Sequence, residues 1–100
     1  MNSYSYTLKT LDNHAELATV DIECAADELT SRAVDYLIQH PNSYLDDGKG
    51  EGYANDNGTL YRFSTCKDAD GTPLIIDQMI EPTADGITIH PSNIRRQLCD

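Results

Sequence analysis

The sequence predicts an α+β fold in which a small antiparallel sheet of four to five strands packs with one main helix. Apolar side chains alternate in two segments near the N-terminus, which is the period of a half-buried strand. A segment with helical spacing follows, and turn residues then separate further apolar runs. Because one helix on one sheet is the simplest way to bury both apolar faces, the expected order is ββα-loop-βββ-short α in a single domain, residues 1–100.

The first two strands are expected to form a hairpin. Residues 4–11 alternate, with Tyr4, Tyr6 and Leu8 on one face. Asp12 and Asn13 supply turn chemistry, because their side chains bond their own backbone and tolerate left-handed geometry. The second strand also alternates. Its inward side chains are Ala18, Val20, Ile22 and Cys24, and its outward side chains are Thr19, Asp21 and Glu23.

Residues 26–39 switch to helical spacing. Asp27 lies where a first-turn acid is favoured by the helix dipole, and Glu28 precedes Arg32 by four residues. Pro41 cannot continue a helix and restricts the residue before it. The apolar stripe of the predicted helix consists of Ala26, Leu29, Ala33, Val34, Leu37 and Ile38.

Residues 41–58 are expected to form a long acidic, glycine-rich loop with at most a short strand around Tyr53. Strands are then expected over residues 59–66, 74–80 and 87–90, the first two joined by a turn at Asp70 and Gly71. Ser92 is in a position to cap a terminal helical turn that carries Ile94 and Leu98.

Charge is the most distinctive property of the chain. It has 17 Asp and Glu against 7 Lys and Arg, a net charge of −10, and residues 12–28 carry six acids and no base. Such a surface repels nucleic acid and anionic membranes and accelerates encounter with basic proteins. Simple solubility is one interpretation of the acidity, and a binding surface for a basic partner is the other.

The sequence contains no pattern typical of an enzyme, a metal site or a cofactor site. Three cysteines lack a C-x-x-C pair, three histidines lack metal-binding spacing, and phosphate-binding glycine motifs are absent. We therefore expect no catalysis, no metal and no cofactor. A less favoured alternative is a small enzyme that uses Cys66 or Cys99 as nucleophile with His90 as base.

The cysteines also bear on compartment. An odd, unpaired set is typical of a reducing cytoplasm, and no N-terminal signal pattern or apolar run of about 20 residues is present. We expect a cytoplasmic protein without membrane contact.

The candidate partner-binding residues follow from the charge pattern. Successive outward residues on a strand lie about 6.6 to 6.8 Å apart, so Asp21 and Glu23 would mimic neighbouring phosphates of an extended nucleic-acid strand. Acids of the helix and the loop extend this row, and two tyrosines offer apolar anchoring. The full candidate set is Asp21, Glu23, Asp27, Glu28, Asp35, Asp46, Asp47, Glu51, Tyr44 and Tyr53.

In its length, its acidic run over residues 12–28 and its acidic loop, the chain resembles small phage-encoded anti-defence proteins, especially anti-CRISPR and anti-restriction DNA mimics. The resemblance implies an inhibitor that occupies the nucleic-acid channel of a basic, nucleic-acid-handling complex in the bacterial host cytoplasm. Bacterial immunity proteins that neutralise toxin nucleases resemble it equally by these criteria and are the alternative.

Overall fold

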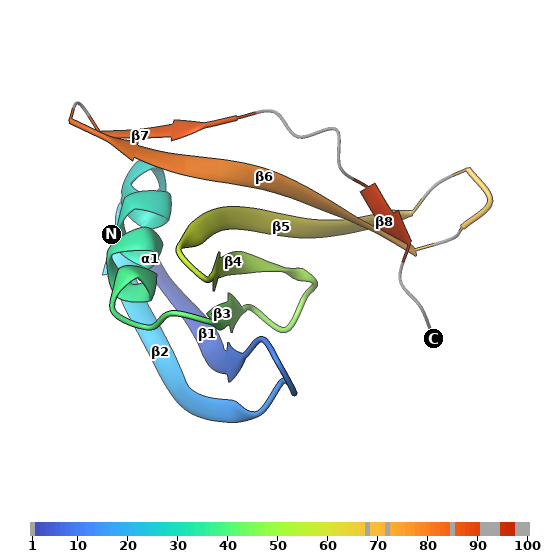
Figure 1. Ribbon diagram of the computed structural model, residues 1–100, viewed down its shortest axis with the longest axis horizontal. Coiled ribbons are helices and arrows are strands. Elements are labelled where there is room, and N and C mark those ends of the chain that lie inside the picture. Colours follow the sequence, from blue (N-terminus) through green and yellow to red (C-terminus); the bar gives the residue numbers. More distant parts are fainter. Residues whose placement is uncertain (1, 68, 72, 85, 91–94, 98–100) are drawn as a thin grey trace.

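The computed structural model describes residues 2–67, 69–71, 73–84, 86–90 and 95–97 (Figure 1). Within them a single antiparallel sheet follows the order β2-β1-β3-β4-β5-β6-β7, and β8 pairs with β6 outside this path. One α-helix, α1 (Leu29–Ile38), follows the 3-10 turn η1 (Ala26–Glu28). The strands are β1 (Asn2–Thr10), β2 (Glu16–Cys24), β3 (Ser43–Asp46), β4 (Glu51–Asp56), β5 (Thr59–Lys67), β6 (Pro73–Thr83), β7 (Gly86–Ile89) and β8 (Arg95–Gln97).

The predicted sheet of four to five strands is therefore wrong in size. The main reason is that residues 41–58, expected as a loop, contain the hairpin of β3 and β4. Ser43 and Leu45 of β3 are buried, whereas the alternate residues Tyr44 and Asp46 are half-buried. The strand is only four residues long, and its period is hidden in the sequence by the acids and glycines that follow it.

Gly52 shows why this hairpin needs glycine. It lies opposite Asp46 in β3 and Phe63 in β5. A Cβ at Gly52 would overlap the carbonyl oxygen of Leu45 and the ring of Phe63. The glycines of this segment therefore belong partly to strand packing, and not only to the flexibility that their number suggests.

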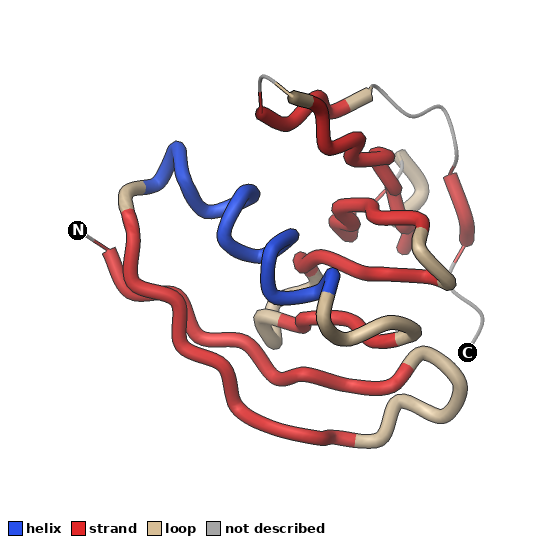
Figure 2. Tube along the Cα trace, turned by 60° about the vertical axis from the view of Figure 1, so that its left-hand side comes forward, coloured by secondary structure: helices blue, strands red, loops and turns tan. Residues whose placement is uncertain are grey.

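The helix packs on one face of the sheet. Figure 2 shows the strands curving around α1, with β1 and β2 on one side and β6 and β7 on the other. Burial of a large aliphatic side chain stabilises the fold by roughly 1.5 to 3 kcal/mol. The largest fully buried side chains are Leu37 and Val34 of the helix and Leu45 and Cys24 of the sheet.

The predicted N-terminal hairpin and the helix stop are confirmed. β1 and β2 pair in register from Asn2 opposite Cys24, and α1 ends at Ile38, before Pro41. Asp27 lies in the 3-10 turn, and no side-chain cap bond is formed at either helical start.

The predicted C-terminal helical turn is corrected in part. Residues 95–97 form strand β8 and pair with residues 74–76 of β6. Ser92, Ile94 and Leu98 lie outside the described residues. An extra strand on β6 satisfies backbone groups that the expected short helix would have left at the sheet edge.

Candidate functional site

The acidic run over residues 12–28 lies at one edge of the sheet, because β2 is the terminal strand of the sheet path. Its six acids are all exposed. Asp21 and Glu23 alternate with the buried Val20, Ile22 and Cys24, so both project from the sheet face opposite α1. Within the described part of the chain neither forms an ion pair.

The hairpin partner of β2 supports these carboxylates without neutralising them. Ser5 lies opposite Asp21, and Ser3 lies opposite Glu23. The Ser5 hydroxyl donates to Asp21 Oδ1 at 2.7 Å. The two carboxylates thus stand beside small polar side chains.

The remaining acids of the helical region are also exposed. Asp27 and Glu28 lie in η1, which follows β2 in the chain and leads into α1, and both are exposed. Arg32 Nη2 lies 3.5 Å from Glu28 Oε2, with 58% and 54% of the two side chains exposed. A pair this exposed contributes little to stability. Asp35 is exposed on α1, in the other layer of the molecule, and is not part of the same row.

Asp46 has a structural role in the β3–β4 hairpin. Its Oδ2 accepts a bond from Lys9 Nζ at 2.9 Å, and its Oδ1 accepts one from the Gly48 N–H, also at 2.9 Å. Partial burial opposes ionisation of Asp46, but these hydrogen bonds and the charge of Lys9 outweigh it and lower the pKa of the carboxyl. The same hydrogen bond raises the pKa of Lys9.

Asp47 closes the turn between β3 and β4. Its Oδ1 accepts hydrogen bonds from the backbone N–H of Lys49 at 2.7 Å and of Glu51 at 3.0 Å. The backbone N–H of Asp47 in turn donates to the Glu51 carbonyl at 3.0 Å. Glu51 itself is exposed at the start of β4.

The two candidate tyrosines occupy opposite faces of the sheet. Tyr44 is half-buried on the face away from α1, where its hydroxyl lies 3.0 Å from His14 Nδ1. Tyr53 is only 7% exposed, and its hydroxyl lies 3.1 Å from Thr30 Oγ1 on the helix. Tyr53 therefore contributes to the core, and most of its ring is not accessible to a partner.

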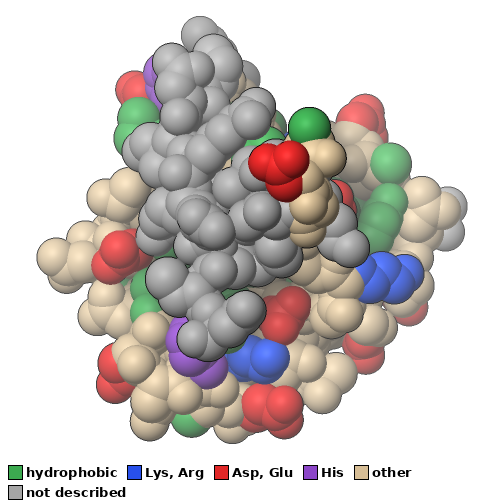
Figure 3. Space-filling view, turned by 90° about the vertical axis from the view of Figure 1, so that its right-hand side faces the viewer, with side chains coloured by type: hydrophobic (Ala, Val, Ile, Leu, Met, Phe, Trp, Pro, Cys, Tyr) green, Lys and Arg blue, Asp and Glu red, His purple; other side chains and the backbone are tan. Residues whose placement is uncertain are grey.

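The charges elsewhere are less ordered. Figure 3 shows a face on which acidic side chains are scattered among uncharged ones, with Lys and Arg between them. The sequence shows the same mixture of charges, because residues 62–100 have 6 acids and 4 bases, whereas residues 12–28 have acids only. The stretch of exposed acids without a base that the structure describes lies at the β2 edge and in η1.

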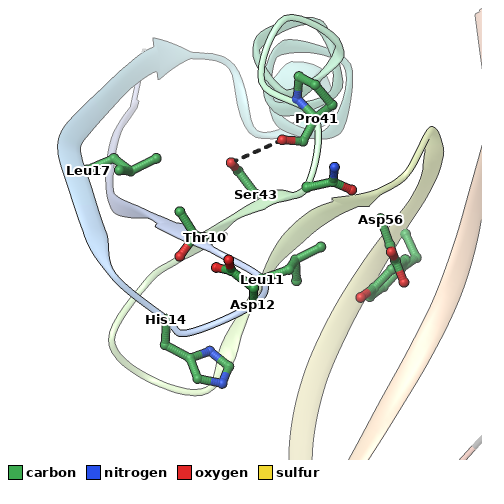
Figure 4. A pocket seen from close by; sticks show the side chains of 10 residues that line it. Thr10, Leu11, Asp12, His14, Leu17, Pro41, Ser43 and Asp56 are labelled. Carbon is green, nitrogen blue, oxygen red and sulfur yellow. Dashed lines mark hydrogen bonds between the residues drawn. The ribbon is translucent and has the colours of Figure 1, made fainter.

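A wide hollow of about 850 Å³ lies between the β1–β2 turn and the start of β3 (Figure 4). Asp12, His14 and Asp56 line it together with apolar and small polar side chains. The Ser43 hydroxyl points at the Pro41 carbonyl across 3.4 Å, so this bond belongs to the chain entering β3. The hollow therefore brings the carboxylate of Asp12, from the β1–β2 turn, and that of Asp56, from the end of β4, into one wall.

A second, smaller hollow of about 300 Å³ lies on the helix side of the sheet. Strand alternation predicts that Tyr4 and Tyr6 lie on one face of the first strand. In the structure they line this hollow with Asp47, Tyr53 and Arg62. No sequence pattern pointed to Arg62, because its place in the wall depends on its pairing with Tyr53 across β4 and β5.

The residues of the alternative that uses a thiol nucleophile are described only in part. No group of three metal-ligating side chains occurs among the described residues. Cys24 is a buried free thiol, the Cys66 side chain and Cys99 lie outside the described set, and His90 pairs with Glu81 at 2.9 Å. Within the same residues, no helix has the length and apolar character needed to cross a bilayer.

Comparison with protein-family models, with curated proteins and with solved structures finds no match to this chain.

Proposed function

We propose that this chain is an acidic interaction protein that occupies the nucleic-acid-binding surface of a basic protein and thereby inhibits it, as an anti-CRISPR or another DNA mimic would. One observation carries the proposal. Asp21 and Glu23 project to the same side of the edge strand β2, are exposed, and have no cationic partner among the described residues.

The geometry of β2 gives the carboxylates a regular spacing. Alternate residues of a strand lie roughly 6.6 to 6.8 Å apart, and a protein that holds phosphates by Lys and Arg recognises their charge and spacing. Asp27 and Glu28, exposed in η1 shortly after β2 in the chain, add two further carboxylates to the proposed surface. A fixed strand holds such charges at a lower entropic cost than a flexible acidic tail would.

Association of this kind depends on salt. Exposed charges interact over about 8 Å at physiological ionic strength, and carboxylate pairs with Lys and Arg weaken as salt rises. The net charge of −10 adds a long-range attraction to any basic partner and disfavours direct contact with nucleic acid. We expect no membrane contact for the same electrostatic reason.

The test is capture from a bacterial lysate with the immobilised chain, followed by competition. We expect nucleic-acid-handling proteins to be retained at low salt, and to be released both by high salt and by a short DNA duplex. Retained proteins that a duplex does not displace would contradict mimicry, because the chain would then contact another part of the partner.

A further inference from the structure

The sheet has an unpaired stretch of edge inside the molecule. β3 is short and pairs only with Thr7 to Thr10 of β1. Among the described strands, none pairs with residues 2–6 of β1 on the side that faces away from β2. Two hollows, of about 300 and 340 Å³, adjoin this edge and share Tyr4, Tyr6 and Asp47 in their walls.

Tyr6 is the most informative residue in these walls. It is only 7% exposed, yet no hydrogen bond to its hydroxyl is formed by any residue that the structure describes. Burial, followed by the nearby Tyr53 and the charge of Asp47, raises the pKa of Tyr6 to about 12. The Tyr6 hydroxyl is not among the fully buried polar atoms that lack a partner, so it remains open to the hollow although most of the ring is buried. The neutral hydroxyl of Tyr6 is therefore available to a group that enters the hollow.

The carboxylates beside Tyr6 are held in place before any ligand arrives. Two backbone N–H groups bind Asp47 Oδ1, which leaves Oδ2 without a hydrogen-bond partner among the described residues. Glu51 lines the same hollow and is exposed. The turn thus presents negative charge next to a group of aromatic rings.

We propose that this pocket binds the guanidinium or ammonium group of an Arg or Lys side chain on an extended segment of the basic partner. The rings of Tyr4, Tyr6 and Tyr53 offer π faces to a cation, and the carboxylates accept its N–H groups. The free edge of β1 offers backbone bonds to an extended chain, as in β-strand addition. The proposal rests on the proposed function and specifies how one basic side chain of the partner is held.

Arg62 distinguishes a pocket that binds a cation from one that binds an anion. It is the one basic side chain in the wall of the 300 Å³ hollow, and Lys49 lines the neighbouring one. A cation in the pocket is repelled by Arg62, whereas an anion would be held by it. Replacing Arg62 with glutamine therefore strengthens the binding of a cation and weakens the binding of an anion.

The experiment uses two short peptides and the full chain in solution. Acetyl-Thr-Arg-Thr-amide is titrated against acetyl-Thr-citrulline-Thr-amide, which has the same shape without the charge, and backbone NMR shifts are followed. We expect the arginine peptide to bind at least about fivefold more tightly, with shifts confined to residues 2–6, 26–30, 47–53 and 62. Equal binding of the two peptides, or shifts elsewhere, overturns the proposal.

Matched variants locate the contacts. Asp47→Asn keeps the oxygen that accepts the two turn bonds but removes the charge, and we expect about tenfold weaker binding from the loss of one charged hydrogen bond. Tyr6→Phe should weaken binding about threefold. Asp56→Asn and Tyr44→Phe are the controls for charge and for a hydroxyl on the opposite face, and should leave it within twofold.

The Arg62→Gln variant completes the test. Tighter binding of the arginine peptide supports the cation pocket, and weaker binding overturns it, as does binding of inorganic phosphate that Arg62→Gln abolishes. The peptide experiment requires no partner protein. If the arginine peptide fails to bind while the chain still captures proteins from the lysate, only the pocket is refuted. Failure of lysate capture with intact peptide binding refutes only the proposed function.

Discussion

Two acidic regions of the molecule use their carboxylates in opposite ways. Residues 12–28 carry acids that are all exposed, and only Glu28 forms an ion pair with a described residue. In the hairpin of β3 and β4, Asp46 and Asp47 are half-buried and accept bonds from Lys9 and from backbone N–H groups of the turn. Acidic composition alone therefore does not reveal a binding surface. Carboxylates without a cationic partner inside the described part of the chain are free to pair with a cation on another molecule.

The largest effect on stability is expected from a substitution in the hairpin of β3 and β4. Gly52→Ala should lower the free energy of unfolding by about 3 kcal/mol or more, because its Cβ meets backbone and the buried side of Phe63. Gly48→Ala has open space around its Cβ, and its positive φ of 78° costs only about 1 kcal/mol. Urea denaturation of both variants measures the difference, and equal losses would mean that Gly52 is not a packing position.

Asp47→Ala comes next in size. Loss of the two backbone N–H bonds to Oδ1 should destabilise the chain by about 1 to 2 kcal/mol. Asp47→Asn retains an accepting oxygen and should lose less than half of that. Denaturation midpoints compare the two, and an Asp47→Ala variant as stable as wild type would remove the structural role of this acid.

The pH dependence at high pH tests the burial of Tyr6. The folded pKa of Tyr6, about 12, lies above the ordinary tyrosine pKa of 10.0, so the unfolded chain loses this proton first. The stabilisation from the neutral hydroxyl is fully present below pH 10 and is lost as the pH rises towards 12. Denaturation at pH 9 and pH 11 should show a smaller decrease for Tyr6→Phe than for wild type. The same decrease in both would show that Tyr6 ionises normally.

The smallest stability effect is expected at the β2 edge. Asp21→Asn with Glu23→Gln should change the free energy of unfolding by no more than about 0.5 kcal/mol, as for other surface positions. At low salt the sign should be stabilising, because the change reduces repulsion in a chain with net charge −10. A decrease of more than about 1 kcal/mol in the free energy of unfolding, measured by thermal or urea denaturation, would show that these acids stabilise the fold as Asp47 does.

Local sequence signals predicted the parts of the fold that have a clear period. The alternation in β1 and β2 and the spacing of Leu29, Ala33 and Leu37 are strong because each element buries a continuous face. β3 lacks such a signal, because it is four residues long and buries only Ser43 and Leu45. A strand that short is formed by its neighbours β1 and β4, and this support lies far away in the sequence.

The candidate site was predictable only as a list of charges. Sequence position grouped Asp21, Asp35 and Asp47, but the structure separates them into the sheet edge, the helix layer and a turn. The tyrosine pocket was not predictable, because it depends on Tyr6 and Tyr53 meeting at 6.3 Å between ring centroids across the sheet. Periodicity predicts which face a residue occupies. It does not predict which hydrogen-bonding groups remain without a partner in the folded chain.

The most direct test of the central claim is quantitative capture by matched charge variants. In the first, Asp21, Glu23, Asp27 and Glu28 are replaced with Gln or Asn; in the control, Asp70→Asn and Glu81→Gln remove exposed charges on and beside β6, at the other end of the sheet path. Circular dichroism verifies the fold of each. We expect the first variant to lose at least about tenfold of the salt-sensitive binding to nucleic-acid-handling proteins, and the control to retain most of it. Adding Asp35→Asn and Asp56→Asn, which are also exposed, to the control makes both variants lose four charges. Equal retention by the two variants would contradict the claim that the β2 edge and η1 form the binding surface.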